Sequence, residues 1–137
     1  MIVVVDTNII IAALVRNSKT RKALISGKIK FVSPDFVKEE LQTHESSIVS
    51  KSGLSREEFS LILALLLEEI EIIPYKEYKD KIPVAKRIMS DDPKDVAYVA
   101  CYRALGCDAV WTNDKDYYGK QGISTLDTKR ILSLLNL

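Results

Sequence analysis

Apolar residues recur along the chain in short β-branched runs that alternate with longer segments of helical periodicity. The first run, residues 2–5, is continuously apolar, which is typical of a strand buried on both faces of a sheet. Further short strands are expected at residues 29–32, 70–73, 109–112 and 123–125. Because helical segments separate these strands, the pattern predicts an α/β sandwich with a mostly parallel sheet.

Capping and turn residues divide the rest of the sequence into helices. The expected helices cover residues 9–16, 19–26, 34–52, 56–69, 96–105 and the segment after residue 127, with a weak, proline-interrupted helix over 75–90. Ser55 and Glu58 have the spacing of a capping box, and Gly27 and Gly106 are typical helix stops. Since no repeat, low-complexity tract or linker interrupts this series, a single domain over residues 1–137 is expected.

Composition is that of an ordinary globular domain. The chain has 137 residues, and its 20 Lys and Arg against 19 Asp and Glu give a formal charge of +1, which excludes a strongly basic polyanion-coating protein and an acidic tail. Apolar runs such as residues 61–67 are far too short to span a bilayer, and the N-terminus lacks the pattern of a signal peptide. The spacing of Cys101 and Cys107 fits neither a zinc clip nor a redox pair, so a cytoplasmic protein with reduced cysteines is expected.

Acidic side chains follow two of the predicted strands. Asp6 ends the strand over residues 2–5, and Asp114 lies two residues past the strand over 109–112. Ligands of open parallel sheets bind beyond the carboxyl ends of the strands, so both acids are expected at the same rim. Either one taken alone is also compatible with an ordinary turn residue.

Glu40 is a third candidate, because it lies on the apolar face of the predicted helix over residues 34–52. It follows Phe36 by one turn, whereas Glu39 falls on the solvated face. A carboxylate on an apolar face costs free energy unless it is paired or bound to a metal. Glu40 is therefore the unusual acid of this helix.

Asp95 is a fourth candidate, at the start of the predicted helix over residues 96–105. With Asp92 as the N-cap, Asp95 also has the position of a capping-box acid, which the helix dipole favours. The helix is apolar nearly all round and should be buried, so its first turn is expected to face the rim of the sheet. Both interpretations of Asp95 remain open at this point.

Four carboxylates at one rim repel one another unless they take up protons or bind a cation. Oxygen-only ligand sets suit Mg²⁺ or Mn²⁺, which activate water and brace a phosphodiester for in-line displacement. Other chemistries lack their parts, since the sequence has one histidine, no Gly-rich phosphate loop and no nucleophile elbow. That histidine, His44, either borders the site or is a half-exposed packing residue.

Four segments carry a family resemblance. They are V-V-V-D-T-N-I-I at 3–10, S-P-D-F-V-K-E-E-L at 33–41, D-D-P-K-D-V-A-Y-V-A at 91–100 and W-T-N-D-K-D at 111–116. In this order and spacing they resemble the PIN domain over essentially the whole chain. The resemblance implies a three-layer α/β/α fold and a Mg²⁺- or Mn²⁺-dependent nuclease, commonly an endoribonuclease that leaves 5′-phosphate and 3′-hydroxyl ends.

The resemblance also assigns roles to individual residues. The family's acids, which bind metal and carry catalysis, fall on Asp6, Glu40, Asp95 and Asp114. Asn8 and Thr112 match polar residues that support the site. Such a set holds one or two metal ions, and the sequence leaves their number open.

Alternatives to these ligands remain open. Glu39 replaces Glu40 if the helix register shifts by one residue, and Asp116 replaces or assists Asp114. Asp92 offers a fifth carboxylate. The position of Glu40 on an apolar helix face favours it independently of the resemblance.

Basic residues are concentrated in one part of the chain. Residues 7–34 contain no acid and six basic residues, namely Arg16, Lys19, Arg21, Lys22, Lys28 and Lys30. A basic stretch beside an acidic metal site is what binding of a phosphate backbone needs. The hypothesis is that RNA contacts Arg16, Lys19, Arg21 and Lys22, and the alternative is a solvated helix face.

Partners follow from the resemblance. Small PIN proteins like this one include VapC-type toxins paired with an antitoxin, so an RNA substrate, an antitoxin partner and a toxin role are implied. The leucine-rich stretch over residues 61–67 exceeds one helix face, which suits an extra core layer or a dimer contact, and small PIN proteins are often homodimers. The alternatives are a catalytically silent PIN module that binds RNA or a protein, and a haloacid-dehalogenase-type phosphatase, which needs an Asp where Asn8 stands.

Overall fold

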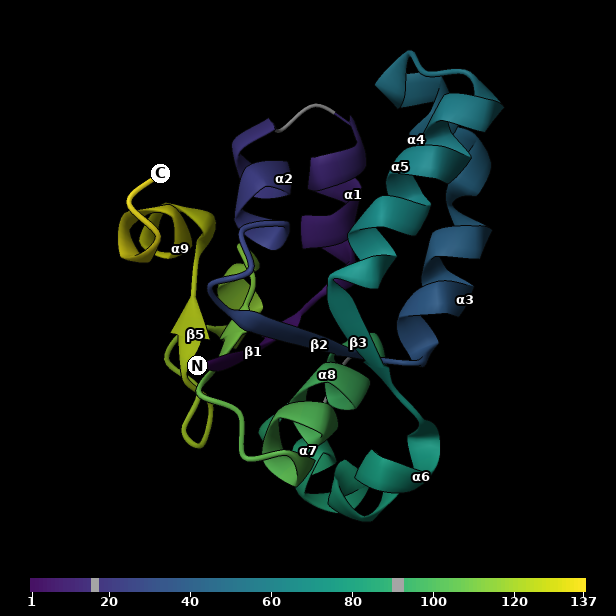
Figure 1. Ribbon diagram of the computed structural model, residues 1–137. Coiled ribbons are helices and arrows are strands. Elements are labelled where there is room, and N and C mark those ends of the chain that lie inside the picture. The colour runs from purple at the N-terminus through teal and green to yellow at the C-terminus, as the bar shows by residue number, and fades with distance from the viewer. Residues whose placement is uncertain (16–17, 90–92) are drawn as a thin grey trace.

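A parallel five-stranded sheet forms the centre of the protein (Figure 1). The computed structural model describes residues 1–15, 18–89 and 93–137. The strands are β1 (Ile2–Val5), β2 (Lys30–Pro34), β3 (Ile70–Ile73), β4 (Ala109–Trp111) and β5 (Thr125–Leu126), in the order β3-β2-β1-β4-β5. Since β1 lies between β2 and β4, residues that follow these three strands are neighbours at one rim.

Helices cover both faces of this sheet. They are α1 (Thr7–Val15), α2 (Ser18–Leu24), α3 (Phe36–Thr43), α4 (Glu45–Ser52), α5 (Arg56–Glu68), α6 (Tyr75–Tyr78), α7 (Ile82–Ile88), α8 (Pro93–Ala104) and α9 (Thr128–Leu134), with short 3₁₀ turns η1 (Lys79–Lys81) and η2 (Lys115–Tyr117). In Figure 1, α1, α2, α5 and α9 lie above the sheet and α6, α7 and α8 below it. The three-layer α/β/α fold expected from the sequence is confirmed.

The side chains of strand β1 explain why helices must cover both faces of the sheet. Val3 and Val5 pack into one apolar core with residues of α1, α2 and α5, whereas Val4 packs into a second core with α8. All three side chains are fully buried. Successive residues of a strand point to opposite faces, so a continuous apolar run requires a helical layer on each side.

Several predicted boundaries need correction. The predicted helix over residues 34–52 is divided at His44, which ends α3 and begins α4 with non-helical backbone angles. The predicted interruption of the helix over 75–90 is confirmed, since η1 separates α6 from α7 and Pro83 sits in the first turn of α7. The last strand pairs at Thr125 and Leu126, two residues later than its predicted start. In contrast, the capping box of Ser55 and Glu58 is confirmed.

Within the described ranges, no helix combines the length and the apolar character that crossing a membrane requires.

Candidate metal centre

A cavity of about 370 Å³ opens at the carboxyl end of β1. Four acids that are far apart in sequence line it: Asp6 after β1, Glu40 in α3, Asp95 in α8 and Asp114 after β4. The complete lining is Asp6, Thr7, Asn8, Ile11, Glu40, His44, Ser47, Ile48, Lys51, Lys94, Asp95, Tyr98 and Asp114. The fold therefore brings all four sequence-predicted acids to one cavity.

Asp6 is the most buried acid of the cavity, with 5% of its surface exposed. Its Oδ1 accepts a hydrogen bond from the backbone N–H of Ile9 at 3.0 Å, so the side chain caps the start of α1. Burial raises the pKa of Asp6 from 3.8 to about 6. Hydrogen bonding by Thr112 and Ile9 lowers this pKa, while the nearby charges of Asp114 and Asp95 add to the increase. A cation bound here would relieve the same unfavourable charge.

Glu40 is held by two hydroxyl groups inside the protein. Its Oε1 accepts hydrogen bonds from Thr7 Oγ1 at 2.8 Å and from the Tyr98 hydroxyl at 2.7 Å, and these two hydroxyls also contact each other. Tyr98 is 2% exposed, and burial raises the pKa of its phenol, which stays protonated and can donate. The second oxygen, Oε2, lies 3.7 Å from Lys94 Nζ.

Asp95 and Asp114 are positioned by different devices. The hydroxyl of Tyr117, which is 1% exposed, donates to Asp95 Oδ1 at 2.8 Å. Burial, with a further contribution from the charge of Asp95, raises the pKa of Tyr117. Asp114 receives its backbone position from Thr112, whose Oγ1 accepts from the Asp114 N–H at 3.0 Å, and its own Oδ1 accepts from the backbone of Asp116 at 2.9 Å.

The alternative acids lie elsewhere. Glu39 is exposed on α3 and does not line the cavity, and the exposed Asp116 likewise contributes only its backbone N–H to Asp114. Asp92 lies outside the described residues. The geometry thus favours Glu40 over Glu39 and Asp114 over Asp116.

A divalent cation fits the donor chemistry of this cavity. The acids offer only oxygen ligands, and the raised pKa of Asp6 reflects its burial, with a smaller contribution from the charges of Asp114 and Asp95. Within the described ranges, no three Asp, Glu, His or Cys side chains approach closely enough to enclose an ion together. Each acid is instead drawn towards a protein donor such as Tyr98, Tyr117 or Lys94. Metal binding would therefore require the acids to converge by side-chain rotation.

Comparison with known families decides what kind of domain this is. The family model described as PIN domain matches residues 4–136. The chain belongs to the PIN domain family. This assignment excludes the haloacid-dehalogenase alternative and confirms the family resemblance of the sequence motifs.

Solved structures with the same fold include two from bacterial toxin–antitoxin systems. A chain of a toxin–antitoxin complex from Klebsiella pneumoniae is 14% identical, with a TM-score of 0.68, and the match covers 92% of this chain and 97% of that chain. A chain of VapBC2 from Rickettsia felis, bound to a DNA fragment from its promoter, is 18% identical, with a TM-score of 0.71 and coverage of 93% and 98%. No curated protein sequence matches the chain.

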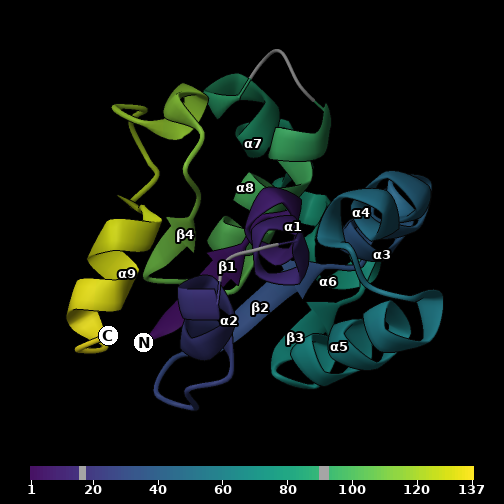
Figure 2. The same ribbon diagram turned by 90° about the horizontal axis from the view of Figure 1, so that it is seen from above.

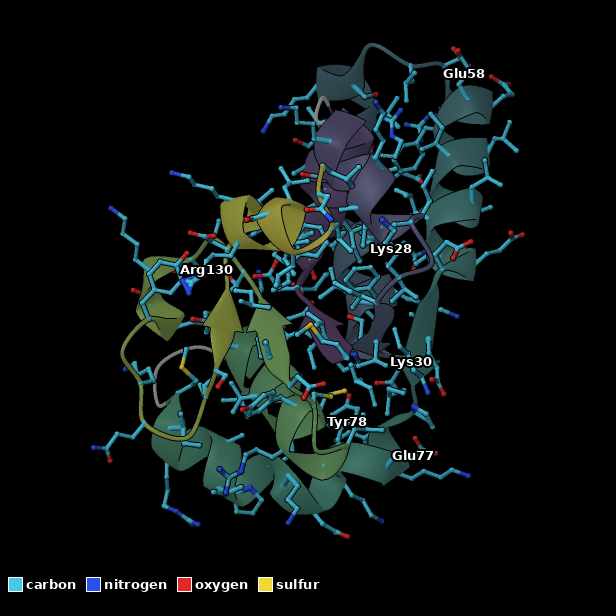
Figure 3. All side chains as sticks on the ribbon, turned by 60° about the vertical axis from the view of Figure 1, so that its left-hand side comes forward. Lys28, Lys30, Glu58, Glu77, Tyr78 and Arg130 are labelled. Carbon is cyan, nitrogen blue, oxygen red and sulfur yellow. The ribbon has the colours of Figure 1, made fainter. Side chains whose placement is uncertain are left out.

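Three basic residues of the stretch over 7–34 make contacts within the protein. Arg21 donates from Nε and Nη2 to the carbonyl of Ala13 at 3.0 and 2.8 Å, which satisfies the end of α1. Lys28 donates to the carbonyl of Leu135 at 3.4 Å, and Lys30 pairs with Glu71 at 3.1 Å. Lys30 begins β2 and Lys28 precedes it by two residues, so both lysines, which Figure 3 labels, lie at the end of that strand opposite the cavity.

The remaining basic residues keep the RNA hypothesis open. Lys19 and Lys22 are exposed on α2 but do not line the cavity. Arg16 lies outside the described residues. The cations that do line the cavity, Lys51 and Lys94, come from helices that the charge count along the sequence did not single out.

Sequence reasoning also missed the hydroxyl groups that position the acids. Thr7 stands between two predicted site residues, and Tyr98 lies one turn after Asp95 in a helix interpreted as apolar packing. Buried tyrosine hydroxyls need hydrogen-bond partners, so a tyrosine one turn from a candidate acid was the available signal. No comparable signal marks Tyr117, because its contact with Asp95 depends on the loop after β4.

Proposed function

We propose that this PIN domain is a Mg²⁺- or Mn²⁺-dependent endoribonuclease. The observation that carries the proposal is the convergence of Asp6, Glu40, Asp95 and Asp114 on one cavity from four separate segments. The PIN family consists in general of nucleases, which supports the same reaction class. Asn8, which also lines the cavity, and the buried Thr112 would support the acids.

The four acids would hold the metal and orient the reactants. A bound Mg²⁺ or Mn²⁺ would activate the attacking water and stabilise charge on the scissile phosphate. One carboxylate would accept the proton of that water as its oxygen bonds to phosphorus. The bond from phosphorus to the 3′-oxygen then breaks, and that oxygen takes up a proton, which leaves 5′-phosphate and 3′-hydroxyl ends.

Lys94 has a second role in this proposal. Its ammonium group lies 3.7 Å from Glu40 and partly neutralises the acids in the metal-free protein. On metal binding, the same group would be displaced from Glu40 and would stand beside the incoming phosphate. A lysine acts here as a mobile positive charge and needs no fixed bidentate geometry.

We also propose a toxin role in the cytoplasm with an antitoxin partner and a homodimeric state. Support for the partner comes from the two toxin–antitoxin structures that share the fold. Support for the dimer comes from α5, where Leu61 and Leu65 are one turn apart and 63% and 51% exposed. Light scattering on the purified protein, compared with Leu61→Glu, tests the dimer contact.

Cleavage of a mixed RNA pool in Mn²⁺, with and without EDTA, tests the nuclease. Cleavage should require the metal and should disappear in Asp6→Asn. Thermal denaturation supplies an independent readout, since Mn²⁺ at 100 times its Kd should stabilise the wild type by about 2.7 kcal/mol. RNA cleavage that persists unchanged in EDTA or in Asp6→Asn contradicts the proposal.

A catalytically silent PIN module that binds RNA or a protein is the second candidate. The observation that favours it is the engagement of Glu40 by Lys94 and of Asp95 by Tyr117, which leaves the described acids apart. Calorimetry distinguishes the candidates: metal binding without cleavage of any tested RNA supports the silent module, and metal-dependent cleavage removes it.

A further inference from the structure

One wall of the cavity contains none of the four acids and has no role in the proposed metal site. It extends from the acids along α4, where His44, Ser47, Ile48 and Lys51 line it. These positions are spaced by three or four residues, so they form one face of the helix. The break at His44 places this face beside α1, and Figures 1 and 2 both show α4 next to α1.

The α4 wall combines a fixed apolar floor with accessible polar groups. Ile48 is 2% exposed and anchors α4 in the core, and Ile11 of α1 packs against the same core while it lines the cavity. In contrast, His44, Ser47 and Lys51 are exposed. Among the described residues, Lys51 makes no ion pair.

Two lysines line the cavity at different places. Lys94 lies beside the acids, 3.7 Å from Glu40, whereas Lys51 lies at the far end of the α4 wall. The seven residue-to-residue steps from His44 to Lys51 correspond to about 10 Å of helix. At the ~3.4 Å axial spacing of stacked nucleotides, that length accommodates about two to three nucleotides.

We propose that the α4 wall is the binding track for a single-stranded RNA segment next to the bond that is cut. The proposal rests on the proposed nuclease function, because it takes the acids as the position of the scissile phosphate. Lys51 contacts a backbone phosphate about two nucleotides away, and His44 and Ser47 lie along the strand between them. The half-buried Ile11 presents an apolar surface to the bases, which have apolar faces of their own.

The test measures binding separately from cleavage. Fluorescence anisotropy of a labelled single-stranded RNA hexamer is followed in EDTA, in an Asp6→Asn background that is expected to be inactive. Lys51→Gln is compared with the matched control Lys81→Gln, which removes an exposed lysine in η1 that does not line the cavity. Removing one phosphate contact should lower the salt slope by about 0.7 and weaken binding about fivefold at ~0.1 M salt, whereas Lys81→Gln should match the parent.

The outcomes are decisive in both directions. Equal RNA affinity and equal salt slope for Lys51→Gln and Lys81→Gln overturn the track, as does a parent that fails to bind the hexamer at ~1 mM protein. A track that accepts an acidic protein segment in place of RNA gives that same equality. Selective loss in Lys51→Gln supports the track even if the unmodified chain cuts no RNA in Mn²⁺, and that combination refutes only the nuclease.

Discussion

Two aspartates follow neighbouring parallel strands and yet have opposite relations to the fold. Asp6 comes directly after β1, and Asp35 comes directly after β2. Asp35 Oδ2 accepts from the backbone of Tyr75 at 2.9 Å, and its Oδ1 accepts from the Tyr78 hydroxyl at 2.6 Å. Both oxygens of Asp35 therefore fasten α6 to the rim of the sheet.

Asp6 also receives hydrogen bonds, from the backbone of Ile9 and from Thr112, but it is buried and faces the charges of Asp114 and Asp95. Burial raises the pKa of Asp6 to about 6, and the nearby charges add to this increase. Asp35, in contrast, does not line the cavity. The position after a parallel strand puts an acid at the rim, but burial and the charges that other elements place beside it decide its role. Asp35 is expected to stabilise the fold, and Asp6 is expected to cost stability until a cation binds.

The largest expected effect separates the two aspartates by activity. Asp6→Asn should lower the rate of Mn²⁺-dependent RNA cleavage at least ~100-fold, because it removes one charge from the proposed metal site. Asp35→Asn should keep the wild-type rate as long as the protein is folded, which circular dichroism checks at the assay temperature. Equal loss in both variants would show that the rim as a whole, and not Asp6, supports activity.

The next largest effect is on the free energy of unfolding, which Asp6→Asn should raise and Asp35→Asn should lower. The pKa of Asp6 is about 6 in the folded protein and 3.8 for an ordinary aspartate, so the metal-free native state binds the proton more tightly than the unfolded state. This contribution is fully present below pH 3.8 and is lost as pH rises towards 6. At pH 8, Asp6→Asn should therefore raise the free energy of unfolding in EDTA by at most about 3 kcal/mol.

At pH 4 most of that gain should vanish, because wild-type Asp6 is then protonated in the native state. Asp35→Asn should instead lower the free energy of unfolding by about 1–3 kcal/mol, since a donor to Asp35 loses its acceptor. Urea denaturation at both pH values measures the two variants. A destabilised Asp6→Asn protein at pH 8 would contradict the assignment of electrostatic cost to Asp6.

The same contrast explains what the sequence could predict. The strand runs and helix caps predicted the sheet and placed Asp6 at its rim, because these signals are local. The face of α3 predicted Glu40, which is 8% exposed. The tyrosine contacts that hold Asp35, Glu40 and Asp95 come from α6, α8 and the loop after β4, and such long-range pairings leave no periodic trace in the sequence.

A smaller effect is expected at the tyrosines that donate to Glu40 in the cavity and to Asp35 outside it. Tyr98→Phe removes a donor to Glu40 and should weaken Mn²⁺-dependent activity about tenfold, with a higher Mn²⁺ concentration needed for half-maximal rate. Tyr78→Phe removes the donor to Asp35 and should cost about 1 kcal/mol of stability without a change in the Mn²⁺ requirement. Mn²⁺ titrations of the cleavage rate, together with urea denaturation, separate the roles. An unchanged Mn²⁺ requirement in Tyr98→Phe would mean that Tyr98 is only a packing residue.

The smallest effects are expected at acids that share the sequence neighbourhood of the site but not its cavity. Glu39 and Asp116 are exposed, and Asp116 contributes only its backbone N–H to Asp114. Glu39→Gln and Asp116→Asn should change the cleavage rate within about twofold and stability within about 0.5 kcal/mol, because exposed substitutions that break no contact are nearly neutral. Glu40→Gln and Asp114→Asn are the matched positive controls. If Asp116→Asn lost as much activity as Asp114→Asn, Asp116 would be the metal ligand in place of Asp114. In that case, the position of an acid in the cavity lining would not distinguish functional acids from structural ones.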